Sequence, residues 1–256
     1  MSTKLKWLND QLSQFELLLM PYLKQHGISR SHVQNYLKSG WLEVVVGGVY
    51  KKPNATISWS SALSALQYQQ ASSLHLSGLS SLAQQGISHY LAMGSETIHF
   101  NSIKAIRLPK WLFSQHWKIE VKCSKVLDQI DENDLIELAV NSQTVKASVI
   151  ELAVLEMLEK VTDESSFIFA VQMFQGFTSL RPRKLQSLLE RSPSMKVKRL
   201  FLFLAQYYQH PWFKRIDESK LALGSGNRQI VKGGYVDKRY LITVPIRFKQ
   251  GELENG

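Results

Sequence analysis

One stretch of the sequence limits the fold more strongly than any other, and it reads HGISRSHVQNYLKSGWLEVVVGGVYKKP over residues 26–53. Gly27 suits the end of one helix, because glycine readily adopts the left-handed conformation that closes a helix. Ser29 is a good N-cap for a further helix over residues 30–38, and Gly40 ends that helix. The start of this stretch therefore predicts two helices joined by a short glycine turn.

A hairpin follows the second of these helices. Residues 42–46 and 49–51 are apolar and rich in β-branched side chains, and a Gly-Gly pair separates them, which is a compact hairpin signal. Upstream, apolar residues recur at helical spacing over residues 4–12, and another helix is predicted over residues 18–25. Three helices and a hairpin within residues 1–53 predict a winged helix-turn-helix.

The predicted helix at 30–38 has the polar side chains that base reading requires. In a helix-turn-helix the second helix of the pair lies in the major groove. Asn and Gln can pair bidentately with adenine, Arg can do so with guanine, and Ser and Lys suit phosphates. Together with the basic end of the hairpin, this helix supplies the candidate DNA-binding residues Ser29, Arg30, Ser31, His32, Gln34, Asn35, Lys38, Tyr50, Lys51 and Lys52.

The charge of the chain favours a polyanionic partner, with nucleic acid ahead of a membrane surface. The 31 Lys and Arg residues against 21 Asp and Glu give a formal net charge of +10. Residues 181–256 hold 16 of these basic residues and only 6 acidic ones, whereas residues 54–180 are net acidic. The basic C-terminal part therefore offers candidate additional nucleic-acid contacts at Arg181, Arg183, Lys184, Lys196, Lys198 and Arg199.

The remainder of the chain mixes helical and strand patterns. We expect helices near residues 60–70, 77–85, 147–158, 167–174, 182–189 and 197–209, and strands near 89–92, 97–100, 117–121, 135–140 and 240–245. The predicted fold class is α+β, with a winged helix-turn-helix over residues 1–53 followed by a larger mixed α/β domain over residues 54–256. The first residues lack the apolar core of a signal peptide, and we expect a cytoplasmic protein without a membrane partner.

Enzymatic chemistry finds little support in the sequence. The run IEVK places Glu120 and Lys122 on one strand, as in a metal-dependent nuclease, but no Asp lies between Asp10 and Asp128 to hold the metal, and Glu96 is a weak substitute. One cysteine, Cys123, excludes both an intramolecular disulfide and a cysteine zinc cluster. No catalytic residue, metal or cofactor is expected. The nuclease stays open as an alternative, and so does a winged helix that binds only protein.

At the level of families, residues 26–53 resemble the N-terminal winged helix of AbiEi-type antitoxins from bacterial type IV toxin–antitoxin systems, which act in abortive infection. The resemblance continues through SVIELAVLEMLEKV at 148–161, through residues 176–206, and through residues 210–245. No single motif is specific to the family, but the order of these blocks is.

The resemblance implies a bacterial, cytoplasmic antitoxin that represses its own operon. Its winged helix would bind inverted repeats in the promoter, and its C-terminal domain would counter a nucleotidyltransferase-like toxin and help cooperative binding to DNA. Antitoxin and toxin need not form a stable complex, and no catalysis or cofactor is implied. The DNA-reading role transfers only to the helix and hairpin residues named above. The operator, the oligomeric state and the residues that oppose the toxin stay open.

Overall fold

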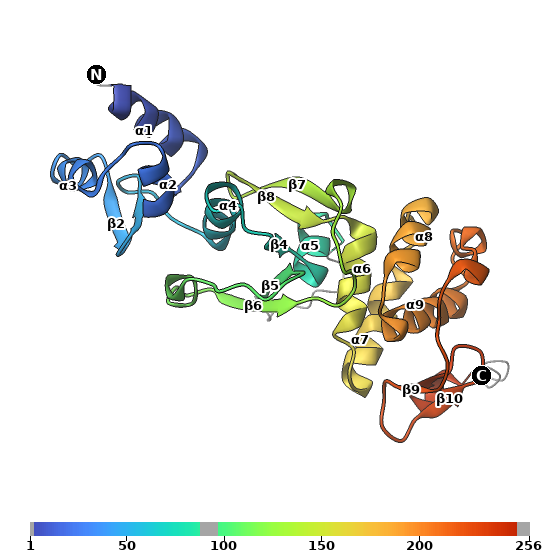
Figure 1. Cartoon of the computed structure of the whole chain (residues 1–256). Coiled ribbons are helices and arrows are strands. Elements are labelled where there is room, and N and C mark those ends of the chain that lie inside the picture. Colours follow the sequence, from blue (N-terminus) through green and yellow to red (C-terminus); the bar gives the residue numbers. More distant parts are fainter. Residues whose placement is uncertain (1–2, 88–96, 250–256) are drawn as a thin grey trace. The chain divides into compact units, whose positions relative to one another are not determined.

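The computed structural model describes residues 3–87 and 97–249, and the chain divides into two compact units (Figure 1). The first unit takes the described residues up to 76 together with 97–121 and 136–147. The second takes 77–87, 122–135 and 148–249. The predicted strand at 89–92 lies outside the described residues.

The first part of the chain folds as three helices and a small antiparallel sheet, which confirms the predicted α+β fold with an N-terminal winged helix. The elements are α1 (Thr3–Gln14), β1 (Leu17–Leu19), α2 (Met20–Gln25), α3 (Arg30–Lys38), β2 (Glu43–Val46) and β3 (Val49–Lys51). The sheet order is β1-β3-β2, and Leu18 lies opposite Tyr50. A core of apolar side chains holds the helices on this sheet; its buried members are Leu8, Leu18, Met20, Leu23, Ile28, Val33, Leu42 and Tyr50.

Strand β1 replaces the first residues of the helix predicted at 18–25. All three of its leucines are buried, and the strand pairs with β3 about thirty residues later in the chain. The helix α2 begins only at Met20, with Pro21 in its first turn, where a missing N–H costs little. Pairing with a distant strand therefore overrides the local helical pattern.

Beyond the winged helix, the first unit contains α4 (Trp59–Gln69) and a five-stranded sheet of order β6-β5-β4-β8-β7 (Figure 1). The strands are β4 (His75–Leu76), β5 (Thr97–Ser102), β6 (Lys118–Cys123), β7 (Leu135–Val140) and β8 (Gln143–Ser148). Strand β4 pairs antiparallel with β5 and parallel with β8. The helix predicted at 60–70 and the strands predicted near 97–100, 117–121 and 135–140 are confirmed.

The winged helix and α4 are joined by a buried side chain. The Gln69 amide donates to the Leu17 carbonyl oxygen at 2.7 Å, and its oxygen accepts from the Leu19 N–H at 2.9 Å. The compact first unit thus continues past residue 53. The domain boundary after residue 53 stays a prediction.

Replacing Gln69 with alanine is expected to destabilise the first unit by about 2 kcal/mol. Two buried backbone groups of β1 would lose their side-chain partner, and each such loss costs about 1–3 kcal/mol when water cannot replace it. Urea unfolding followed by circular dichroism measures the change. Gln70→Ala is the matched control, because Gln70 is exposed at the end of the same helix. Equal midpoints for the two variants would contradict the prediction.

The second unit consists of five helices and a small three-stranded sheet of order β10-β11-β9, as far as the chain is described. The elements are α5 (Gly78–Gln84), α6 (Ile150–Glu159), α7 (Glu164–Gln175), α8 (Pro182–Arg191), α9 (Met195–Tyr208), β9 (Arg228–Gln229), β10 (Tyr235–Asp237) and β11 (Ile242–Val244). Every residue of α9 from 197 to 205 is buried, so α9 is the central helix of this unit. No helix among residues 3–87 and 97–249 is long and apolar enough to cross a membrane.

Candidate nucleic-acid interface

Helix α3 begins at a capping box that involves two of the predicted site residues. The Ser29 hydroxyl accepts from the His32 backbone N–H, and the His32 ring nitrogen Nδ1 accepts from the Ser29 N–H at 3.1 Å. Ile28 and Val33 are buried and fix the helix on the winged-helix core. Ser29 and His32 therefore set where α3 starts and which way it faces.

The remaining polar residues of α3 form an exposed face. Arg30, Ser31, Gln34, Asn35 and Lys38 are all exposed. Apart from the Ser31 hydroxyl, which lies 2.7 Å from the hydroxyl of the N-cap serine, their side chains have no hydrogen bond or ion pair to another described residue. The structure thus leaves an arginine, two amides and a lysine available on one short helix, as the sequence predicts.

The hairpin does not present the basic end that the sequence suggests. Tyr50 is only 8% exposed, and its hydroxyl donates to the Met20 sulfur. Lys51 pairs with Glu43 at 3.1 Å and donates to the Ala55 carbonyl at 2.7 Å. Tyr50 belongs to the winged-helix core, and Lys51 lies directly across from Glu43 on the neighbouring strand β2. Only Lys52 of the three is exposed.

Of the three cations expected on α9, two lie inside the second unit and Lys196 is partly buried, which corrects their placement. Arg199 and Lys198 are each 1% exposed. The Arg199 guanidinium donates to four backbone carbonyl oxygens, those of Leu223, Gly224, Gly226 and Leu241, at 2.6–3.1 Å. Lys196 donates to the Glu159 carbonyl at 3.1 Å, and burial lowers the pKa of its ammonium group. The reason is that α9 is covered on every side over residues 197–205, where Lys198 and Arg199 lie.

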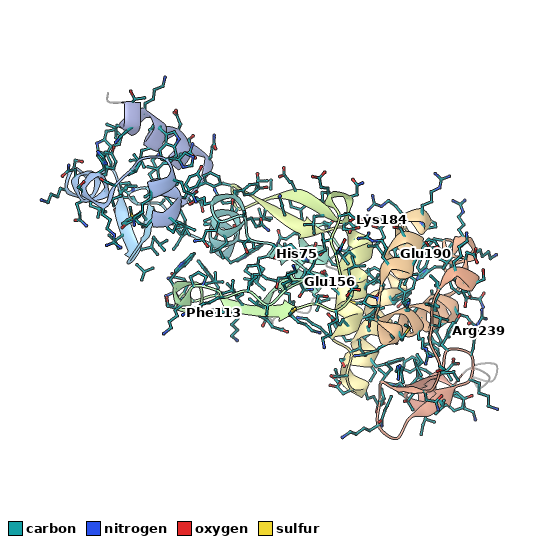
Figure 2. All side chains as sticks on the ribbon, viewed as in Figure 1. His75, Phe113, Glu156, Lys184, Glu190 and Arg239 are labelled. Carbon is teal, nitrogen blue, oxygen red and sulfur yellow. The ribbon has the colours of Figure 1, made fainter. Side chains whose placement is uncertain are left out.

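The cations at the start of α8 are mostly paired. Arg181 forms a bidentate pair with the buried Glu151 carboxylate, at 2.9 and 2.7 Å. Lys184, labelled in Figure 2, pairs with the fully buried Asp134 at 2.7 Å. Arg183 is exposed and has no partner among the described residues. These side chains lie on a surface cavity of about 770 Å³, lined by Leu180, Arg181, Pro182, Arg183, Lys184, Gln186 and Arg215.

The two residues considered for a nuclease site, Glu120 and Lys122, each lie close to a different charged partner. Glu120 lies 3.2 Å from His99, and Lys122 lies 3.2 Å from Glu159. No group of three or more His, Cys, Asp or Glu side chains that could hold a metal ion occurs within 3–87 and 97–249. Glu96 lies outside the described residues. Within the described residues, Glu120 and Lys122 therefore do not belong to such a metal-holding group.

Comparisons with known proteins agree on one family. A family model described as transcriptional regulator, AbiEi antitoxin, type IV TA system, matches residues 95–245, and the model of the AbiEi antitoxin N-terminal domain matches residues 1–93. No functionally curated protein matches the chain. Among solved structures, the crystal structure of the RV2827C protein from Mycobacterium tuberculosis matches with a TM-score of 0.56 and 15% sequence identity, over 94% of this chain and 89% of that one. At that identity the match supports the fold.

Proposed function

This chain belongs to the AbiEi family of antitoxins, which are transcriptional regulators of type IV toxin–antitoxin systems, and we propose that it represses its own operon. In this proposal α3 lies in the major groove of inverted repeats in the promoter. Regulation rather than catalysis is the activity of this family. The observation that carries the proposal is the unpartnered polar face of α3, set by its capping box.

The chemistry of that face assigns a role to each exposed group. Asn35 and Gln34 can each donate to and accept from an adenine edge, and Arg30 can donate twice to a guanine edge. Lys38 and, on the hairpin, Lys52 suit phosphates. Ser29 and His32 are committed to the helix cap and act by positioning α3. The base-reading set we propose is therefore Arg30, Gln34 and Asn35.

The other half of the proposal is that the chain counters a nucleotidyltransferase-like toxin, and the match to an antitoxin family supports it. Such a regulator acts in the bacterial cytoplasm, on duplex DNA and on its cognate toxin. Ion pairs with the buried Asp134 and Glu151 carboxylates hold cations in the second unit, and a basic surface cavity lies at the start of α8. Opposition to the toxin could act through direct contact, through the toxin's RNA substrate, or through modification of the toxin.

Asn35→Ala is expected to reduce the preference for the chain's own promoter over a scrambled duplex by about 1–3 kcal/mol, since one bidentate base contact is lost. Fluorescence anisotropy with both duplexes at several salt concentrations measures this preference. Asn9→Ala is the matched control, because Asn9 is exposed on α1, outside the proposed reading helix. If the two variants show the same preference, α3 does not read bases through Asn35.

A further inference from the structure

The end of the β5–β6 hairpin carries a run of basic and aromatic residues that the DNA-reading helix does not account for. The segment 103–118 reads IKAIRLPKWLFSQHWK and contains no Asp or Glu. Its Lys and Arg residues are Lys104, Arg107, Lys110 and Lys118, and all four are exposed. The segment therefore concentrates positive charge within a part of the chain that is acidic on average.

The side chains of these four cations are free to bind an anionic partner, unlike most of the cations in the C-terminal part of the chain. None of their charged side chains has an ion pair or hydrogen bond to another described residue. By contrast, Arg181 and Lys184 are paired with buried carboxylates, and Arg199 is saturated by carbonyl oxygens. The nearest acidic residue in sequence, Glu120, already lies 3.2 Å from His99. The charge of the segment is thus uncompensated.

The segment is also anchored to the core that supports the winged helix. Leu112 is fully buried in the same cluster as Leu17 and Val49 of the winged-helix sheet and Phe100 of β5. Trp111 and Trp117 pack against this cluster, as do Ile106 and Leu108. A short 3-10 helix over Lys110–Phe113 makes the turn. Both surfaces belong to one compact unit, so the cations are held by the same core as the wing.

One aromatic ring of the segment remains outside the core. Phe113 is 51% exposed, and Figure 2 shows it at the end of the β5–β6 hairpin. Aromatic residues are enriched at interfaces relative to the rest of the protein surface. The ring is therefore part of the exposed surface of the segment. In sequence it lies between Lys110 and Lys118, whose positive charges suit an anionic partner.

We propose that segment 103–118 is a second contact with duplex DNA, which binds the phosphate backbone while α3 reads bases. This inference rests on the proposed function, because it assigns a further contact with the same DNA. Duplex DNA carries one negative charge per roughly 1.7 Å of axis, so exposed cations on one hairpin end can each neutralise a phosphate. Such contacts position the protein and add affinity but carry no sequence information.

The test is a triple variant with Lys104→Gln, Lys110→Gln and Lys118→Gln, in the full-length protein. Each phosphate contact contributes about 0.9 to the slope of log affinity against log salt, so the slope should become shallower by roughly 2–3. The ratio of affinities for the promoter and for a scrambled duplex should not change. The control removes equal charge from exposed lysines of the second unit, through Lys214→Gln, Lys232→Gln and Lys238→Gln, and should leave the slope within error of the parent.

The outcomes separate this inference from the proposed function. Loss of Asn35 should change the affinity ratio and keep the slope, whereas the hairpin triple should change the slope and keep the ratio. If the parent protein binds both duplexes equally, the proposed function fails, and a shallower slope in the hairpin triple would still support a backbone contact. An unchanged slope in the hairpin triple, or the same change in both triples, overturns the inference.

Discussion

Replacing Arg199 with methionine should destabilise the second unit by more than about 4 kcal/mol. The guanidinium is 1% exposed and donates to the carbonyl oxygens of Leu223, Gly224, Gly226 and Leu241. Methionine fills much of the space but donates nothing, so the carbonyl groups of Leu223, Gly224 and Gly226 lose their side-chain donor, at about 1–3 kcal/mol each where they stay dry. The Leu241 carbonyl keeps the hydrogen bond from the Arg228 N–H. A whole domain is stable by only about 5–15 kcal/mol. Urea unfolding followed by tryptophan fluorescence measures the loss.

Arg183→Met is the control for this variant. Arg183 is exposed on α8 and has no partner among the described residues, so its loss should change stability by less than about 0.5 kcal/mol. Arg199→Lys should also be strongly destabilising, because an ammonium group cannot reproduce the planar fork that reaches several carbonyl oxygens at once. Similar unfolding midpoints for Arg199→Met and Arg183→Met would show that α9 does not depend on this guanidinium.

Asp134→Asn should cost the second unit about 3–5 kcal/mol, because it removes the charge from a buried ion-pair cluster and leaves the cations in place. The Asp134 carboxylate is fully buried and accepts from Lys184 at 2.7 Å, from Arg191 at 2.8 Å, and from the Asp131 N–H at 2.7 Å. Asp128→Asn, at an exposed position of the same loop, is the matched control. An equal effect of the two substitutions on the urea midpoint would contradict the prediction.

The ion pairs of Asp134 also make the stability of the folded protein depend on pH in the acidic range. Burial raises the pKa of Asp134, but the hydrogen bonds from Arg191 and Lys184 outweigh it and hold the pKa below the ordinary value. A carboxyl with a lowered pKa in the folded state stabilises fully above its unfolded pKa of about 3.9, and this contribution is lost as the pH falls through the folded pKa. The parent protein should therefore lose stability below about pH 4. Asp134→Asn should show a shallower dependence in unfolding experiments at stepped pH, and identical profiles would contradict the argument.

Local signals in the sequence were sufficient to predict α3 and its exposed face. Gly27 has a φ of +75°, and Ser29 caps the helix, as its position before a polar helix predicts. These features depend on residues within one helical turn of each other. For the same reason the predicted α+β class and the positions of most helices are confirmed.

Long-range contacts explain what the sequence could not predict. Strand β1 exists because Leu18 pairs with Tyr50, and that pairing also buries the tyrosine that we expected on the DNA side. Arg199 follows a helical pattern that is compatible with a solvated face, but the loop at 221–226 folds over it. Charge pairing across distant segments, such as Lys184 with Asp134, leaves no pattern in the sequence.

The basic segment at 103–118 shows a different limit. Its signal was present in the sequence, since sixteen residues contain four Lys or Arg and no acid. The region 54–180 as a whole is nevertheless net acidic, because its acidic residues lie mainly after residue 127. Only the structure shows that Leu112 anchors it to the core shared with the winged helix.

Base reading by α3 can be measured as the preference of the protein for the promoter of its own operon. The dissociation constants of the unmodified protein are determined by anisotropy, at physiological salt, for that promoter and for a scrambled duplex of equal length. If α3 reads bases there, the promoter is bound at least about 10³-fold more tightly than the scrambled duplex. Equal affinity for the two duplexes, with a steep salt dependence for both, would contradict base reading, because the protein would then bind only the DNA backbone.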